Sequence, residues 1–324
     1  MLITWQDHYM PEVIALWNAE MVKDSYKEMT EESLGSIIWH NHYFDKESTF
    51  LWLEDGVPQG FGCGCTGSDL PYGDVAGYIT CLTVGEGVVN RDDVYAALLT
   101  ALEGRFRSLG KSQAEVLFFN PMQLPWYVPN TPGHEHNNAP GVPAGSELHK
   151  FLGSVGYAER AIEHAMYMRL DSYEIPDSVP AKEERAGEAG YSVALYDPEC
   201  HSGVEEMLAA LGNPLWSKDI ADSVAGGVPF LVAAHAGRAV GFAGPLIRSE
   251  SGRGYFTGIG VMQEHEGRGL GSLLFFRLCE AFRDIGADYM SLYTGSTNPA
   301  IGIYEKAGFE TVKEFAVMRR ELGS

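Results

Sequence analysis

Cysteine, basic residues and long apolar runs are all scarce in this sequence of 324 residues. The five cysteines form no even set, which predicts no disulfide framework and a reducing, cytoplasmic environment. Cys63 and Cys65 are too close for a common metal-binding pair, and no second pair accompanies them. We therefore expect no metal site and interpret these two cysteines as buried strand residues.

No apolar run is long enough to span a membrane, and residues 1–5 lack the basic and apolar regions of a signal peptide. We therefore expect a cytoplasmic protein with no membrane partner. The formal charge of −21, from 23 Lys and Arg against 44 Asp and Glu, argues against nucleic acid as a partner, because phosphate would be repelled. The acidity either attracts a cationic amine or serves only solubility, and the composition leaves both open.

The most informative stretch is a glycine-rich turn between an apolar run and a helical pattern. The run covers 255–261, and the turn reads Gly267-Arg268-Gly269-Leu270-Gly271. One buried helix face is predicted by the spacing of Leu274, Leu278, Ala281, Phe282 and Ile285, and Gly286 ends the pattern. Glycines let a backbone approach a phosphate, and the free N–H groups of a helix start point at it. This layout is typical of an anion-binding site.

Several kinds of anion site compete for this turn. A Walker loop requires Gly-Lys-Ser/Thr, which is absent, and a dinucleotide fingerprint requires Gly or Ala where Ser272 stands. A glycine-rich helix start that binds nothing also remains open. The spacing present, G-x-G-x-G after a strand that ends at Val261, resembles the acyl-CoA loop of the GCN5-related N-acetyltransferases, the GNAT family.

A second segment extends the resemblance. A strand is predicted at 288–294. Residues 298–309 then read N-P-A-I-G-I-Y-E-K-A-G-F, which resembles the family's segment N-x-x-A-x-x-x-Y-x-K-x-G-F. An ordinary helix with a structural Tyr304 is the alternative. Two motifs in the correct order and separation favour the family fold.

Two residues depart from the family pattern. Glu266 stands where the family has Arg or Gln, and Gln263 replaces the usual Pro. A carboxylate beside a diphosphate is unfavourable unless it points away or is paired. Arg268, inside the loop, is the candidate to offset it.

The resemblance implies where coenzyme A binds and which residues act. It implies a gap between splayed strands at 255–261 and 288–294, acetyl-CoA as co-substrate, no metal, and Tyr304 as the proton donor to the departing thiolate. The implied binding residues are Ile259, Gly260, Val261, Gly267, Arg268, Gly269, Leu270, Gly271, Ser272, Asn298 and Ala300. Candidates for the base that deprotonates the amine are Glu206, Asp219, Glu250, Glu264 and His265, and the sequence selects none.

The same order of elements recurs in the first half of the chain. Residues 77–84 match 254–261 at a constant offset, and Asn120-Pro121 matches Asn298-Pro299. We therefore predict an α/β chain with α+β mixed sheets, built as two tandem GNAT-like folds. The predicted domains are a degenerate copy at 1–170, an exposed linker at 171–190 and the acetyltransferase domain at 191–324.

The first copy has lost the features of the site. Residues 87–93 contain no G-x-G-x-G, and Leu152 stands where the second copy has Tyr304. Asp92 and Asp93 would repel a diphosphate at that helix start, so we predict that this copy binds no CoA.

The first copy also carries an insertion, Met122 to Ser146. It is rich in Pro, Gly, Asn and His. We expect a mobile surface loop, with Pro125-Trp126-Tyr127 as candidate pocket residues. His134 and His136 are a weaker candidate for a metal pair.

The leading functional hypothesis is an acetyl-CoA-dependent N-acetyltransferase that acts on a primary amine of a small molecule or peptide, as a monomer or homodimer. Two alternatives remain. A non-catalytic CoA-binding or sensing module is favoured by Glu266. A structural scaffold of two inactive folds would bind no CoA at all.

Overall fold

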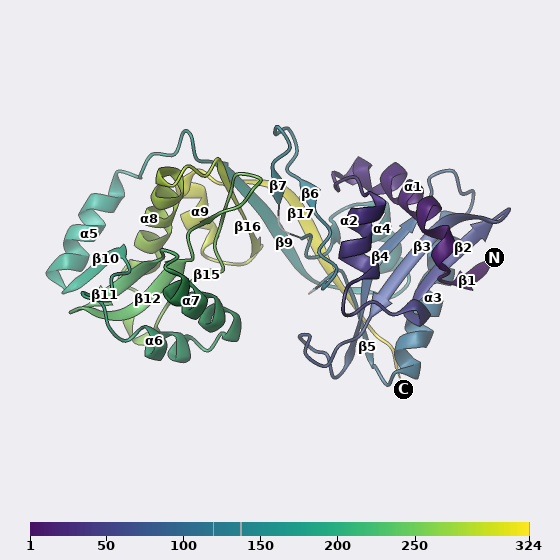
Figure 1. Ribbon diagram of the computed structural model, residues 1–324, viewed down its shortest axis with the longest axis horizontal. Helices are drawn as coiled ribbons and strands as arrows, with labels where there is room; N and C mark the ends of the chain where they lie inside the picture. Colours follow the sequence, from purple (N-terminus) through teal and green to yellow (C-terminus); the bar gives the residue numbers. More distant parts are fainter. Residues whose placement is uncertain (119, 137, 324) are drawn as a thin grey trace. The chain divides into compact units, whose positions relative to one another are not determined.

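A computed structural model describes residues 1–118, 120–136 and 138–323. The chain packs into two compact units (Figure 1). Unit 1 comprises Met1–Ala165, Tyr293–Thr297 and Thr311–Ser324, and unit 2 comprises Met166–Leu292 and Asn298–Glu310. The predicted domains follow the sequence repeat, so they divide the chain at one place. The structural units divide it differently, because the last strand of the chain packs in unit 1. The predicted fold class, α/β with mixed sheets, is confirmed.

The sheet of unit 1 is an antiparallel meander extended by a parallel strand. Its strands are β1 (Leu2–Thr4), β2 (Thr49–Glu54), β3 (Val57–Cys65), β4 (Ala76–Val84), β5 (Gln113–Val116) and β17 (Glu310–Glu321). Strand β5 pairs in parallel with β4 and antiparallel with β17. Cys63 and Cys65 are buried on β3, as predicted.

Helices cover both faces of this sheet (Figure 1). They are α1 (Met10–Met21), α2 (Glu31–Leu34), α3 (Arg91–Ser108) and α4 (Glu147–Ser154). Successive residues of β3 point to opposite faces of the sheet. Gly60, Gly62 and Gly64 are on the face that α3 covers, where they lie against its side chains. Phe61, between them, packs edge-on against Trp39 of the opposite face.

The insertion at 122–146 is more buried than predicted. It contains β6 (Trp126–Tyr127), β7 (Glu135–His136) and β8 (Val142–Pro143). Trp126 is fully buried, stacks on His136 with ring centres 4.8 Å apart, and donates its indole N–H to Tyr293 Oη at 2.8 Å. The expectations of a surface loop and of a pocket residue were therefore wrong for Trp126, which belongs to the core of unit 1.

Unit 2 is built around a four-stranded antiparallel sheet and a smaller strand group. The sheet contains β10 (Tyr191–Leu195), β11 (Leu231–His235), β12 (Arg238–Gly244) and β15 (Gly258–Val261). The group contains β13 (Ile247–Arg248), β14 (Arg253–Tyr255) and the first part of β16 (Tyr289–Gly295). Strands β9 (Ala158–Arg169) and β16 each have residues in both units.

Two hydrophobic cores lie on opposite faces of the four-stranded sheet (Figure 1). Helix α8 (Leu270–Asp284) covers one face, and α6 (Val204–Leu211) and α7 (Pro214–Gly226) cover the other. Along β11, Leu231 and Ala233 join the α8 core, whereas Val232 joins the α6–α7 core. Helix α9 (Ile301–Ala307) packs beside α8.

The segment 171–190, in which the sequence predicts an exposed linker, contains helix α5 (Ser178–Glu188). Val179 and Ala186 are buried in the α8 core. Pro180 does not prevent the helix because it stands in the first turn, where a backbone N–H has no intrahelical partner. Two buried residues among many charges give too weak a periodicity to reveal this helix.

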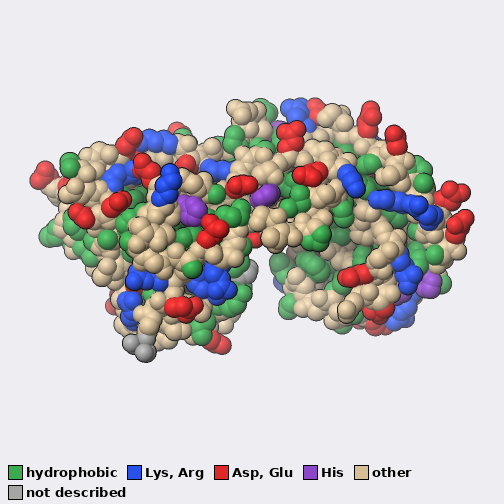
Figure 2. Space-filling view, turned by 180° about the vertical axis from the view of Figure 1, so that it is seen from behind, with side chains coloured by type: hydrophobic (Ala, Val, Ile, Leu, Met, Phe, Trp, Pro, Cys, Tyr) green, Lys and Arg blue, Asp and Glu red, His purple; other side chains and the backbone are tan. Residues whose placement is uncertain are grey.

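Charge is dispersed over the face that Figure 2 shows. Figure 2 shows acidic side chains spread over the visible face, interspersed with smaller groups of Lys and Arg. Within the described part of the chain, no helix combines the length and the apolar character needed to cross a bilayer.

The two matched glycines at the start of the sequence repeat have the same structural role. Gly77 lies on β4 beside β5, and Gly254 lies on β14 beside β16, both in parallel pairs. A Cβ on Gly77 would lie 2.3 Å from the ring of Phe106, and a Cβ on Gly254 would lie 2.8 Å from the ring of Phe282. In both copies, glycine therefore allows a phenylalanine of the covering helix to rest on the sheet.

We expect Gly77→Ala to lower the free energy of unfolding by about 1–3 kcal/mol, because the added methyl group overlaps a fully buried ring. Denaturant titration measures this change. Gly153→Ala on α4 is the matched control, since a Cβ there meets nothing within 4 Å. Equal stability of the two variants would contradict the close approach.

Candidate functional site

The strands of unit 2 diverge beside the glycine-rich turn. Strand β14 pairs with β16 through Arg253–Tyr289 and Gly254–Met290. The chain then continues into β15, which pairs with β12 alone among the described strands and forms the end of its sheet. One edge of β15 therefore presents main-chain groups that a ligand can pair with. The divergence agrees with the splayed strands that the sequence resemblance implies.

Two glycines hold β15 tightly against α6 and α7. A Cβ on Gly258 would lie 2.3 Å from the indole of Trp216, and a Cβ on Gly260 would lie 2.9 Å from Leu211. The indole N–H of Trp216 also donates to the carbonyl of Thr257 at 3.1 Å. These contacts keep β15 with β12 and away from β16.

The glycine-rich turn prepares the start of α8. Gly267 and Gly269 have φ angles of +74° and +79°, which glycine adopts at little cost. Gly269 is the N-cap of α8, and no side chain caps this helix. The N–H groups of residues 270–272 are those that an α-helix leaves without an intrahelical partner, and they carry the positive end of the helix dipole. This helix start can bind an anion.

A cavity of about 740 Å³ opens at this helix start. Its walls come from β15, the glycine-rich turn, α8 and the start of α9. The lining residues are Ile259, Gly260, Val261, His265, Glu266, Gly267, Gly269, Leu270, Gly271, Ser272, Phe275, Asn298, Pro299, Ala300, Ile303 and Tyr304. The volume lies in the range of small-molecule and cofactor sites. The structure thus brings together every predicted site residue except Arg268.

Arg268 is the one predicted binding residue that does not line the cavity. Its guanidinium lies 3.5 Å from the carbonyl oxygen of Glu264 and 5.4 Å from the ring centre of Tyr191. Among the described residues, Arg268 forms no ion pair with Glu266, which lines the cavity and is exposed. The expectation about this charge was wrong because sequence order does not fix the direction of a long side chain.

Tyr304 lies on α9 with its ring packed against α8. Its ring centre is 4.8 Å from that of Phe275. No described residue hydrogen-bonds its hydroxyl. Burial raises the pKa of Tyr304 above its ordinary value, so the phenol keeps its proton at neutral pH. Tyr304 is therefore available as a proton donor.

Asn298 and Ala300 form the turn before α9. The side-chain oxygen of Asn298 accepts a hydrogen bond from the N–H of Ala300 at 2.9 Å. Asn298 lines the cavity, and this bond uses its oxygen and leaves its side-chain N–H groups available as donors.

Of the five candidate bases, His265 alone lines the cavity. Its Nδ1 is 2.9 Å from the hydroxyl of Tyr191, which fixes the ring. Glu206 pairs with Arg238 at 3.7 Å, and Asp219 lines a different hollow beside Tyr255.

Besides His265, which was predicted only as a candidate base, four lining residues were not predicted as site residues: Glu266, Phe275, Pro299 and Ile303. Phe275 follows Gly271 by four residues, so helical spacing places both on one face of α8. That spacing was a signal available in the sequence.

The corresponding helix start in unit 1 is acidic. Helix α3 begins at Arg91, with Asp92 and Asp93 in its first turn. The guanidinium of Arg91 is engaged by Glu147 at 2.7 Å and by the carbonyl of Val84 at 2.9 Å. Leu152, which replaces the tyrosine, is fully buried.

Comparison with known proteins agrees with this geometry. Residues 197–309 match the acetyltransferase (GNAT) family. No curated protein matches the sequence. The fold is similar to that of a GCN5-related N-acetyltransferase from Sphaerobacter thermophilus, with a TM-score of 0.62 and 16% identity over 100% of this chain and 96% of the other.

Two further solved structures share the fold. A tandem GNAT protein from the clavulanic acid biosynthesis pathway has a TM-score of 0.58 and 14% identity, covering 100% of this chain and 99% of the other. The GCN5-related glucosamine N-acetyltransferase region of a fungal multi-domain β-N-acetylglucosaminidase has a TM-score of 0.66 and 15% identity. The match covers 99% of this chain but only 38% of the fungal one. The two tandem GNAT-like folds predicted from the sequence are thereby confirmed.

We expect Gly271→Ala to weaken acetyl-CoA binding about tenfold without loss of stability. A Cβ on Gly271 meets no protein atom within 4 Å, so the methyl group occupies cavity space that a close ligand needs. Isothermal titration calorimetry measures the dissociation constant.

The matched control is Gly104→Ala, in helix α3 of unit 1, where a Cβ also meets nothing within 4 Å. Both substitutions favour the helix by up to about 1 kcal/mol. Unchanged acetyl-CoA binding by the Gly271 variant would remove the glycine-rich turn from the ligand site.

Proposed function

We propose that the GNAT-family domain at residues 197–309 transfers an acetyl group from acetyl-CoA to a primary amine of a small molecule or peptide. The family supports acetyltransferase activity (EC 2.3.1.-) in general terms. One observation carries the proposal for this chain: a single cavity joins an uncapped helix start, the strand β15 and Tyr304. We place the enzyme in the cytoplasm, as a monomer or homodimer that needs no metal.

The cavity suits the shape and chemistry of acetyl-CoA. The N–H groups of residues 267–272 would hold the diphosphate, because Cβ atoms are absent from three positions of the turn. The free edge of β15 would pair with the amide groups of the pantetheine arm, as an added strand does. Asn298 and Ala300 would contact the same arm from the start of α9.

The reaction is attack of a neutral amine on the thioester carbonyl. An amine with a pKa of about 10.4, like that of lysine, is mostly protonated at neutral pH, so a base must remove a proton. His265 is the candidate base on the cavity. The nitrogen then bonds to the carbonyl carbon, whose oxygen a main-chain N–H near Ile259 would stabilise. When the carbon–sulfur bond breaks, Tyr304 would protonate the thiolate.

Turnover on an amine panel tests the proposal. Released CoA thiol is measured with acetyl-CoA and lysine-containing peptides, polyamines or glucosamine. Glucosamine belongs in the panel because one structural neighbour is a glucosamine N-acetyltransferase region. The acidic net charge of −21 favours cationic acceptors by long-range attraction.

A second function, weak CoA binding without catalysis, as in a sensing module, is favoured by Glu266, which stands where the family has Arg or Gln. This exposed carboxylate lines the cavity and repels the phosphates that the helix start attracts. Binding of acetyl-CoA without turnover on any amine would support this function. Absence of both binding and turnover would leave a structural scaffold.

We expect Tyr304→Phe to lower kcat on the order of 100-fold, a typical effect of losing a proton donor, and to change the acetyl-CoA dissociation constant little. The benzene ring keeps its packing against Phe275. Tyr196→Phe, which keeps its stacking on Phe230 outside the cavity, is the control. An unchanged kcat in the Tyr304 variant would exclude it from the chemistry.

We also expect one molecule of acetyl-CoA to bind per chain. Asp92 and Asp93 occupy the helix start of unit 1, and the nearby Arg91 is already paired. Calorimetric titration gives this stoichiometry directly. Two binding sites per chain would contradict the assignment of unit 1 as a degenerate copy.

A further inference from the structure

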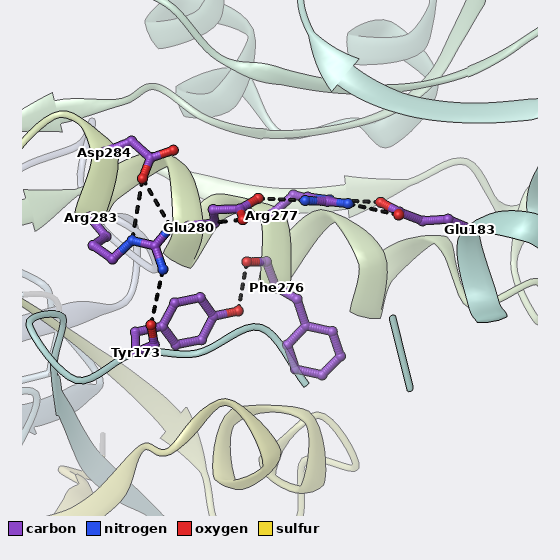
Figure 3. A network of polar contacts seen from close by, with 7 residues as sticks. All are labelled: Tyr173, Glu183, Phe276, Arg277, Glu280, Arg283 and Asp284. Atoms are coloured by element: carbon purple, nitrogen blue, oxygen red, sulfur yellow. Dashed lines mark hydrogen bonds and ion pairs between the residues drawn. The ribbon is translucent and has the colours of Figure 1, made fainter. Parts of the chain in front are cut away.

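Polar contacts hold helix α5 against α8 (Figure 3). Arg277 of α8 makes a two-point contact with Glu183 of α5, at 2.7 Å for both Nε and a terminal nitrogen. Arg277 also contacts Glu280 at 2.5 Å. Before α5, the hydroxyl of Tyr173 donates to the carbonyl of Phe276 at 2.8 Å. Two-point Arg–carboxylate contacts fix orientation as well as distance, so the side chains of α5 have defined positions on α8.

Lys182, the neighbour of Glu183, lies over the first two turns of α8. Its ammonium is 3.1 Å from Ser272 Oγ and 5.3 Å from the ring centre of Phe276. Ser272 lines the cavity and also donates to the carbonyl of Gly269 at 2.8 Å. Lys182 therefore contacts the first turn of α8 directly, through its hydrogen bond to Ser272.

This lysine has no acidic partner. No Asp or Glu of the described residues forms an ion pair with Lys182 or with Lys306. The pKa of Lys182 is lowered by burial first, and then by the nearby charges of Lys306 and Arg185. Acidic residues outnumber basic ones in this chain by 44 to 23, so most lysines could find a carboxylate partner. A lysine that lies near other cations and pairs with no carboxylate therefore indicates a place suited to an anion.

We propose that Lys182 binds the diphosphate of acetyl-CoA together with the main-chain N–H groups at the start of α8. This inference rests on the proposed function. Neither Lys182 nor Arg268 lines the cavity, but Lys182 contacts Ser272, which does, whereas Arg268 contacts Glu264 and Tyr191. Lys182 would therefore supply the cation that offsets the negative charge of Glu266. A cation on one side and the positive helix end on the other attract the same anion. Helix α5, which precedes the second copy in the sequence, thereby becomes part of the binding site.

Lys182→Met tests this role, since methionine keeps an apolar stem over Phe276 and removes the charge. We expect the acetyl-CoA dissociation constant to rise about five- to tenfold at low salt, with a smaller change at high salt. Lys182→Arg should retain most of the affinity. The control is Lys46→Met, which removes one charge from an exposed pair with Asp7 in unit 1 and should leave binding unchanged.

The outcomes separate the inference from the proposed function. Equal affinity of the wild type and Lys182→Met overturns the inference alone. Absence of binding by the wild type overturns both. Titration with 3′-dephospho-acetyl-CoA locates the contact: an equal loss for both ligands supports the diphosphate, and a loss confined to acetyl-CoA overturns that assignment. Thermal unfolding of each variant confirms that α5 remains folded.

Discussion

Unpaired main-chain N–H groups at the start of α8 are the feature on which the rest of unit 2 depends. They remain open because Gly267 and Gly269 turn the chain with positive φ angles and no side chain caps the helix. The helix itself is held in place by a fully buried face against the four-stranded sheet. The divergence of β15 from β14 and β16 then opens the space in front of these groups. The cavity is therefore a consequence of backbone geometry more than of any single side chain.

Unit 1 shows that the same backbone plan need not preserve the chemistry. Gly77 and Gly254 meet the rings of Phe106 and Phe282 in equivalent ways, so the packing of sheet and helix has been kept in both copies. At the helix start of unit 1, however, acidic side chains occupy the first turn and a buried leucine replaces the tyrosine. Packing constrains the fold in both copies, whereas the proposed anion-binding role would constrain the turn in only one of them.

The sequence predicted the features that follow from local spacing, namely the glycine-rich turn, the helix behind it and the repeat. It did not predict four features that depend on distant contacts. Helix α5 has too few buried residues to show a periodicity, Trp126 is buried by Tyr293 far along the chain, and Arg268 turns toward Tyr191. Lys182 lies 90 positions before Ser272, its hydrogen-bond partner, and no pattern of residues near either one indicates the contact.

Amide hydrogen exchange with and without acetyl-CoA tests the central claim most directly, because it reports on the main-chain N–H groups themselves. The account predicts that acetyl-CoA slows exchange most strongly at residues 267–272 and along β15, and leaves the start of α3 in unit 1 unchanged. Slowed exchange at the start of α3, with residues 267–272 unaffected, would contradict it.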